Sequence, residues 1–171
     1  MRRELATVED TRAFGEELAS SLRAGDLVVL SGPLGAGKTA LAQGIGKGLG
    51  VQGRVTSPTF VIARVHRGPL PLVHVDAYRL RDSASDSGLV DLDDLEIDEE
   101  LDRAVVVVEW GEGVVEALSD SHLDVRLERR DDDVRVVTID GVGPRWAGGP
   151  PYPGGLSQAE PDRGDSPQQP A

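Results

Sequence analysis

The amino-acid sequence predicts an α/β fold in which helices flank a central sheet of mixed, mainly parallel strands. Three features point to this fold: short apolar runs bounded by turn residues, apolar residues at helical spacing between those runs, and two late segments in which apolar and polar residues alternate. Continuous runs are typical of strands buried on both faces, whereas alternation late in the chain is typical of a hairpin. The length of 171 residues suits one compact domain.

The first half of the chain contains two predicted helices and one predicted strand. Thr7 and Asp10 form a capping-box pattern that begins the first helix, and Gly25-Asp26 ends it. The apolar residues of that helix recur every four positions, at Phe14, Leu18 and Leu22. Residues 27–30 are a continuous apolar run and predict a buried strand. After a glycine-rich turn, the second helix stops at Gly50 and is marked by Leu41, Ile45 and Leu49.

The second half is richer in strands. Strand-like segments cover residues 61–66 and 72–76, and an acidic, helical region is predicted over residues 83–101. Four consecutive valines at 105–108 give the clearest buried strand, because β-branched side chains favour the pleated sheet. Alternating residues between 123 and 138, with a turn at 129–133, predict a hairpin. Buried strands flanked by helices, followed by this hairpin, indicate a sheet of mixed direction.

The composition changes after Gly143. Residues 144–171 contain seven prolines and five glycines, and their few large apolar residues are Trp146, Tyr152 and Leu156. Such a segment buries too little apolar surface to offset the entropy of ordering it. We therefore predict a folded domain over residues 1–143 and a disordered tail over residues 144–171.

Charge and composition exclude several classes of protein. Thirty acidic and eighteen basic residues give a net charge of -12, which argues against a protein that binds nucleic acid mainly through its own phosphate contacts. The absence of cysteine excludes disulfides, zinc–thiolate sites, iron–sulfur clusters and thiol nucleophiles. There is no apolar run of eighteen residues and no secretory signal pattern at the N-terminus. We expect a cytoplasmic protein with no membrane partner.

Residues 32–39, Gly-Pro-Leu-Gly-Ala-Gly-Lys-Thr, match the phosphate-binding pattern G-x-x-x-x-G-K-[ST]. A predicted strand precedes them and a predicted helix follows, which is the context that this pattern requires. Glycines allow backbone N–H groups to face phosphate oxygens, Lys38 can reach the outer phosphates, and the Thr39 hydroxyl can bind Mg²⁺. An ordinary glycine-rich turn is the alternative, but one of only two lysines in the chain lies here. The fold is thus predicted to be a three-layer fold of the P-loop NTPase type.

A P-loop needs acidic partners at the ends of neighbouring strands. Glu109 directly follows the valine strand and is the candidate for holding Mg²⁺ or its water, the alternative being a solvated strand end. Asp76 ends another strand and could polarise the attacking water, complete the outer shell of the metal, or cap the strand. Trp110 is compatible with core packing or with nucleotide contact, and His74 is interpreted as a packing residue. Residues 57–59, Ser-Pro-Thr, form a weak candidate for a switch loop.

Missing patterns narrow the function further. Lys47 is not followed by the aspartate of an [NT]-K-x-D segment, which disfavours a guanine-specific site. No further insertion of more than about 20 residues could serve as the lid of a small-metabolite kinase, so a free-standing kinase of this class is the weaker alternative. A nucleotide-dependent binding switch, in which hydrolysis is incidental, is a third possibility.

Four segments together resemble the TsaE (YjeE) family, the small P-loop ATPases of bacterial tRNA threonylcarbamoyladenosine synthesis. They are residues 35–39, Ser57-Pro58-Thr59-Phe60, the segment His-Val-Asp-Ala-Tyr-Arg-Leu at 74–80, and Val108-Glu109-Trp110. The resemblance extends from about Thr7 to Ile139. The P-loop is generic, whereas the H-x-D-x-Y-R-L and E-W segments at these distances are specific. The polar segment 83–87 and the residues beyond 143 depart from the family pattern.

The resemblance implies specific roles for these residues. Thr39 and Glu109 would bind Mg²⁺, and Asp76 and Glu109 would act in catalysis near the γ-phosphate. Residues 57–59 would form a switch-like loop, and Thr7 to Thr11 would border the adenine. The residues implied to contact ATP or ADP are Thr7, Thr11, Gly35, Ala36, Gly37, Lys38, Thr39, Ala40, Asp76 and Trp110.

The resemblance also implies partners. In the family, the ATPase acts with TsaB and TsaD, and TsaD transfers the threonylcarbamoyl group to A37 of tRNAs that read codons beginning with A. The ATPase would energise turnover of that complex and would meet tRNA indirectly, which agrees with the acidic composition of this chain.

Overall fold

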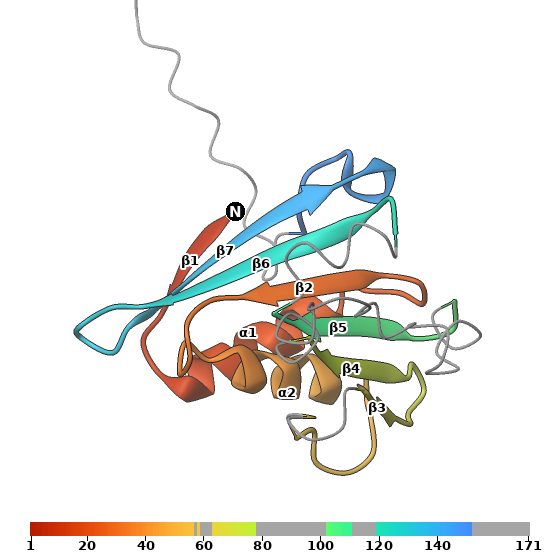
Figure 1. The fold of residues 1–171 in the computed structure, drawn as a ribbon, viewed down its shortest axis with the longest axis horizontal. Coiled ribbons are helices and arrows are strands. Elements are labelled where there is room, and N and C mark those ends of the chain that lie inside the picture. Colours follow the sequence, from red (N-terminus) through yellow and green to blue (C-terminus); the bar gives the residue numbers. More distant parts are fainter. Residues whose placement is uncertain (57, 59–62, 78–101, 111–118, 152–171) are drawn as a thin grey trace, which may run out of the picture.

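A computed structural model of the chain describes residues 1–56, 58, 63–77, 102–110 and 119–151. This part forms a seven-stranded sheet in the order β1-β7-β6-β2-β5-β4-β3 (Figure 1). The strands are β1 (Arg2–Leu5), β2 (Leu27–Ser31), β3 (Ala63–His66), β4 (Leu72–Asp76), β5 (Val105–Glu109), β6 (His122–Arg129) and β7 (Arg135–Val142). Neighbours within the central group β6-β2-β5-β4 run parallel, and β1, β7 and β3 are antiparallel to their neighbours. The mixed α/β sheet is as predicted.

The helices α1 (Val8–Ala19) and α2 (Lys38–Gly48) lie side by side on one side of the sheet (Figure 1). Their backbones are close: a methyl group at Gly15 would lie 2.5 Å from the carbonyl oxygen of Leu41. The predicted capping box is present, with reciprocal hydrogen bonds between Thr7 and Asp10. Helix α1 nevertheless ends at Ala19 rather than at Gly25, because turns follow in which the Asp26 carboxylate accepts a hydrogen bond from the backbone of Arg23.

The sheet is buried on both faces. Val28 and Leu30 of β2 belong to a core cluster that includes the apolar residues of both helices, whereas Leu27 and Val29 belong to a second cluster. All five residues of β5 are buried, as the valine run predicts. The predicted helical region at residues 83–101 lies outside the described residues. No helix of the described part is long and apolar enough to cross a membrane.

The strand predictions are confirmed in their main points. Strand β4 has the predicted bounds, β5 extends the valine run by Glu109, and β6 and β7 form the predicted hairpin. Strand β1 was not predicted, because its four residues are mostly polar and only Leu5 is buried. Strand β1 pairs with β7 at the edge of the sheet through backbone hydrogen bonds. Such pairing requires no apolar pattern in the sequence, so no periodicity indicates this strand.

The C-terminal boundary requires a correction. Pro144–Trp146 form a 3-10 helix, and Trp146, only 5% exposed, belongs to the main core cluster. Arg145 donates to both carboxylate oxygens of the buried Asp26, at 3.0 and 3.1 Å. A single large apolar side chain and an ion pair over 119 positions hold this segment, and neither is visible in average composition. The prediction of a disordered tail from residue 144 is therefore wrong for these residues, and residues 152–171 lie outside the described part.

Candidate functional site

The loop between β2 and α2 has a backbone that only glycine accommodates easily. Gly32, Gly35 and Gly37 have φ angles of 136°, 79° and 111°, in the region that L side chains rarely adopt. Gly32 also passes close to Leu127 of β6, so that a Cβ there would collide with its carbonyl. Gly37 is the N-cap of α2 and makes no side-chain capping hydrogen bond. The loop therefore brings the positive end of the α2 dipole to the candidate site.

Lys38 is 5% exposed although it carries a charge. Its ammonium donates hydrogen bonds to the carbonyl oxygens of Gly32, at 2.7 Å, and Pro33, at 3.0 Å. It also lies 4.0 Å from the centre of the Trp110 ring, which is a cation–π contact. Burial lowers the pKa of Lys38, and the nearby carboxylates of Glu109 and Asp76 oppose this shift. The loop thus holds a cation in a partly dehydrated position, where it would interact strongly with a bound anion.

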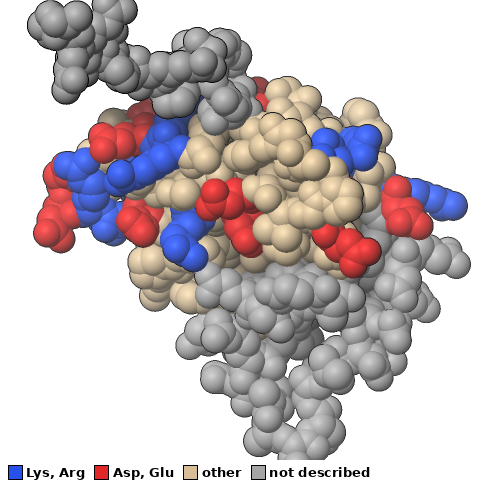
Figure 2. Space-filling model, turned by 90° about the horizontal axis from the view of Figure 1, so that it is seen from above, with Lys and Arg blue, Asp and Glu red and all other residues tan. Residues whose placement is uncertain are grey.

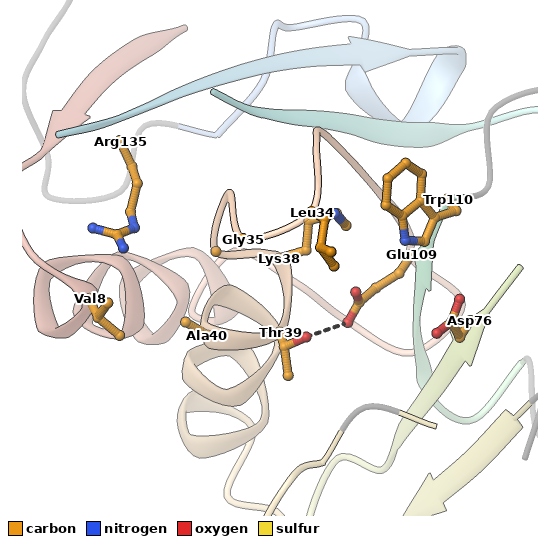
Figure 3. Close-up of a pocket in the computed structure, with 11 residues that line it drawn as sticks. Val8, Leu34, Gly35, Lys38, Thr39, Ala40, Asp76, Glu109, Trp110 and Arg135 are labelled. Atoms are coloured by element: carbon orange, nitrogen blue, oxygen red, sulfur yellow. Dashed lines mark hydrogen bonds between the residues drawn. The ribbon is translucent and has the colours of Figure 1, made fainter. Parts of the chain in front are cut away.

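Glu109 is the last residue of β5, and residues of α2 and β4 lie next to it. Its Oε1 atom accepts a hydrogen bond of 3.2 Å from the Thr39 hydroxyl (Figure 3). The same atom lies 2.9 Å from Nε2 of His74. Asp76 is the register partner of Glu109 on the neighbouring parallel strand. The interpretation of His74 as a packing residue is therefore incomplete, since this fully buried side chain contacts the predicted acidic residue. The signal was its position two residues before Asp76 on one face of a strand.

These residues surround a cavity of about 740 Å³. Its lining residues are Val8, Leu34, Gly35, Gly37, Lys38, Thr39, Ala40, Asp76, Glu109, Trp110 and Arg135 (Figure 3). Eight of the predicted site residues are thus brought together, from Gly35 to Trp110. Three others are not in the lining. Ala36 is buried and donates its N–H to Pro33, Thr7 caps α1, and the buried Thr11 donates its hydroxyl hydrogen to the Thr7 carbonyl.

Val8 lies within the segment from Thr7 to Thr11 that was expected to border the adenine, whereas the sequence did not indicate Leu34 or Arg135 as site residues. Arg135 begins β7, and the hairpin carries it to the loop, where its Nε would lie 3.5 Å from a Cβ built on Gly37. This Nε is buried and has no hydrogen-bond partner among the described residues. Figure 3 shows Arg135 at the end of the cavity opposite Asp76. No local pattern could have revealed this residue, because strand pairing alone places it there.

Trp110 has a φ of 62°, which is unusual for a residue other than glycine. The backbone N–H of Trp110 donates to the carbonyl of Leu30 on β2, at 3.1 Å, and the side chain lines the cavity beside Lys38. The backbone strain is thus linked to the orientation of an aromatic side chain toward the site. Trp110 therefore lies in the lining of the cavity, and its contact with a nucleotide stays a prediction.

The arrangement has a basic half and an acidic half. Lys38, Arg135 and the start of α2 favour a phosphate chain, whereas Thr39, Glu109 and Asp76 offer the hard oxygen ligands that Mg²⁺ prefers. Among the described residues there is no group of three or more metal-ligating side chains of the His, Cys, Asp and Glu types. Residues 57, 59 and 60, with 78–80, lie outside the described part, so the switch-loop prediction stays a prediction.

Comparisons with known proteins agree with this description. A family model described as threonylcarbamoyl adenosine biosynthesis protein TsaE matches residues 5–137. A Streptomyces coelicolor protein named tRNA threonylcarbamoyladenosine biosynthesis protein TsaE is 57% identical in an alignment of 144 residues, and the match covers 80% of this chain and 93% of that protein. A Bacillus subtilis protein of the same name is 38% identical in an alignment of 140 residues, and the match covers 81% of this chain and 84% of that protein. The crystal structure of Bacillus subtilis YdiB superposes with a TM-score of 0.68 at 31% identity, covering 84% of this chain and 86% of that one.

Proposed function

Because the chain belongs to the TsaE family and so acts in tRNA threonylcarbamoyladenosine biosynthesis, we propose that it is the ATP-binding and ATP-hydrolysing subunit of that process. One observation carries the proposal: a P-loop lysine, a threonine hydroxyl and two strand-terminal carboxylates line the same cavity. Phosphoryl-transfer sites of the P-loop class need this combination, because catalysis there depends on positioning and on neutralising charge.

The basic half of the cavity would hold the phosphates of ATP or ADP. Lys38 would exchange its two carbonyl contacts for phosphate oxygens, and the backbone of Gly35, Gly37 and Ala40 would follow the phosphate chain. Arg135 offers a buried Nε without a protein partner in the described part, which suits an additional phosphate contact. Trp110 would lie beside the nucleotide.

The acidic half would hold Mg²⁺ and the water that attacks the γ-phosphate. Thr39 and Glu109 would bind the ion, directly or through its water, and a bound Mg²⁺ would neutralise charge on the phosphates. Asp76, in register with Glu109, would orient the attacking water. The roles of Thr7 and Thr11 at the adenine are retained as a proposal, with Val8 between them as the residue that lines the cavity.

The partners proposed are TsaB and TsaD, with modification at A37 of tRNAs that read codons beginning with A. Contact with tRNA would be made by the partners, since this chain carries a net charge of -12. On the face shown in Figure 2, Lys and Arg side chains are interspersed with Asp and Glu and do not form a broad basic surface. We further propose that the protein is cytoplasmic, where its tRNA substrates would be.

Binding and hydrolysis of ATP test this proposal when measured with and without TsaB and TsaD. Lys38→Ala should weaken ATP binding about tenfold or more, because a hydrogen bond to a charged group contributes roughly 1.5–3 kcal/mol. Lys47→Ala is the matched control, because Lys47 is exposed and pairs with Glu16 away from the cavity. Glu109→Ala should reduce turnover more than binding, since a metal ligand acts chiefly on the transition state. Wild-type behaviour of Lys38→Ala would contradict the assignment, and ATP binding without partner-stimulated hydrolysis would favour a binding switch.

A further inference from the structure

His74 is a polar residue in a place where the sequence otherwise has valine. It is fully buried in β4 between Val73 and Val75, and it is the register partner of Val107 on β5. A buried imidazole is costly unless it is hydrogen-bonded, so an apolar side chain would stabilise this position more simply. The contact that His74 makes is with Glu109, 35 residues later, at 2.9 Å between Nε2 and Oε1.

The contact determines which imidazole nitrogen carries the proton. An ionised carboxylate only accepts hydrogen bonds, so Nε2 of His74 must donate to Oε1 of Glu109. Nδ1 of His74 is buried and has no hydrogen-bond partner among the described residues, so a proton there would be an unsatisfied donor. The neutral tautomer protonated at Nε2 is the form that fits both nitrogens.

Two donors from different elements meet the same oxygen atom of Glu109. The Thr39 hydroxyl comes from the first turn of α2 and His74 from the neighbouring strand, and both contact Oε1. Two contacts to one oxygen restrict rotation of the carboxylate, and neither of them uses Oε2. One oxygen of Glu109 is thereby engaged with the protein, in a side chain that lines the cavity.

We propose that His74 is a positioning residue, which orients the Glu109 carboxylate so that Oε2 can bind Mg²⁺ or its water. This inference rests on the proposed ATPase function for the role of Glu109, but the His74–Glu109 hydrogen bond itself does not. A role of this kind, in which a hydrogen-bonded partner fixes a ligand to a metal, is a general feature of metal sites. Loss of His74 is therefore expected to affect the Mg²⁺-dependent step and to leave the P-loop contacts with the phosphates in place.

The first test uses the full-length wild-type protein without nucleotide. Long-range ¹⁵N–¹H NMR spectra of histidine-labelled protein distinguish the two neutral tautomers, and Glu109→Gln identifies the signals that depend on the carboxylate. We expect His74 to be protonated at Nε2 and its Nε2 signal to shift in Glu109→Gln. A His74 protonated at Nδ1, or one that is insensitive to Glu109, would overturn the proposal whatever the ATPase activity is.

The second test compares His74→Leu, which keeps the volume but removes the donor, with His74→Gln, which can present an N–H near the former Nε2. In the presence of TsaB and TsaD, His74→Leu should lower kcat about tenfold and raise the Mg²⁺ concentration for half-maximal rate, with little change in KM for ATP. His74→Gln should recover most of this loss. His122→Gln, a substitution of another buried histidine on β6, is the control.

The outcomes separate this inference from the proposed function. Equal rates for His74→Leu and the wild type, or a His74→Gln variant no better than a folded His74→Leu, would assign His74 to packing alone. If His74→Leu does not fold, His74→Met, which also lacks the donor, takes its place in the same comparison with His74→Gln, and a folded His74→Gln with impaired Mg²⁺ dependence contradicts the inference. If the wild type itself neither binds nor hydrolyses ATP, the proposed function fails, and the NMR result still decides whether the hydrogen bond exists.

Discussion

Truncation after Gly143 should destabilise the protein strongly, although it removes only residues that composition alone assigns to a tail. The truncation takes away Trp146 from the main core cluster and Arg145 from the buried Asp26. A chain that ends at Pro151 is the matched control, because it keeps both residues and removes only residues 152–171.

The magnitude can be estimated from the two contacts. Breaking a buried ion pair costs about 3–5 kcal/mol, but a quarter of the Arg145 side chain is exposed, so we take about 2 kcal/mol. Loss of a buried tryptophan costs about 3–5 kcal/mol, reduced by roughly 1–2 kcal/mol because its Nε1 has no partner in the described part. Since the two side chains stack at 3.9 Å, their contributions are not independent. We expect a loss of about 4 kcal/mol in the free energy of unfolding, a large part of the 5–15 kcal/mol typical of a domain.

Urea unfolding followed by far-ultraviolet circular dichroism measures this loss without relying on the fluorescence of Trp146. With a slope of about 2 kcal/mol per molar urea, the midpoint of the 1–143 chain should lie about 2 M below that of the 1–151 chain. Arg145→Met in the 1–151 chain should account for roughly half of the difference. Midpoints within about 0.3 M of each other would refute the reasoning and return residues 144–146 to the tail.

Three further outcomes are expected. Arg135→Ala should raise the Kd for ATP about tenfold, because a charge-assisted hydrogen bond to the phosphates is lost. Arg126→Ala removes the same charge outside the cavity lining and should leave the Kd unchanged. If calorimetry finds equal effects for the two variants, only the net charge of the protein matters for ATP binding. Because burial lowers the pKa of Lys38, this side chain should lose its charge in the alkaline range below 10.5, the ordinary lysine value, and ATP affinity should fall as the pH rises through that range. Calorimetry should find no such fall for Lys38→Ala. Burial, with His74 and Arg64 nearby, lowers the pKa of His66, so the unfolded state binds more protons than the folded state and stability should decline as the pH falls below 6.5. The urea midpoints at pH 7.5 and pH 5.5 should therefore differ less in His66→Gln than in the wild type. An equal difference in the two proteins would contradict this.

Features with a local cause were predictable from the sequence. The capping box at Thr7, the loop before Lys38 and the valine strand before Glu109 depend on residues close to one another in the chain. Asp76 was also found, because a strand that ends in a carboxylate is visible as an apolar run with an acidic end.

Features with a long-range cause were not predictable. Arg135 reaches the P-loop only because β7 pairs with β6 and β6 pairs with β2. His74 contacts Glu109 because β4 and β5 are neighbours, and Arg145 contacts Asp26 across 119 positions. Each contact depends on strand order or chain return, and periodicity within a single segment carries no information about either.

Reconstituted modification of tRNA tests the central proposal most directly. The measurement is the amount of threonylcarbamoyladenosine that TsaB and TsaD form on tRNA over many turnovers when the activated threonylcarbamoyl donor is supplied. Four reactions are compared: with the wild-type protein, with Lys38→Ala, with Lys47→Ala, and without this protein. We expect sustained modification with the wild type and Lys47→Ala, and little modification with Lys38→Ala or without the protein. Sustained modification by Lys38→Ala at the wild-type rate would contradict the proposal that ATP bound at this P-loop drives the process.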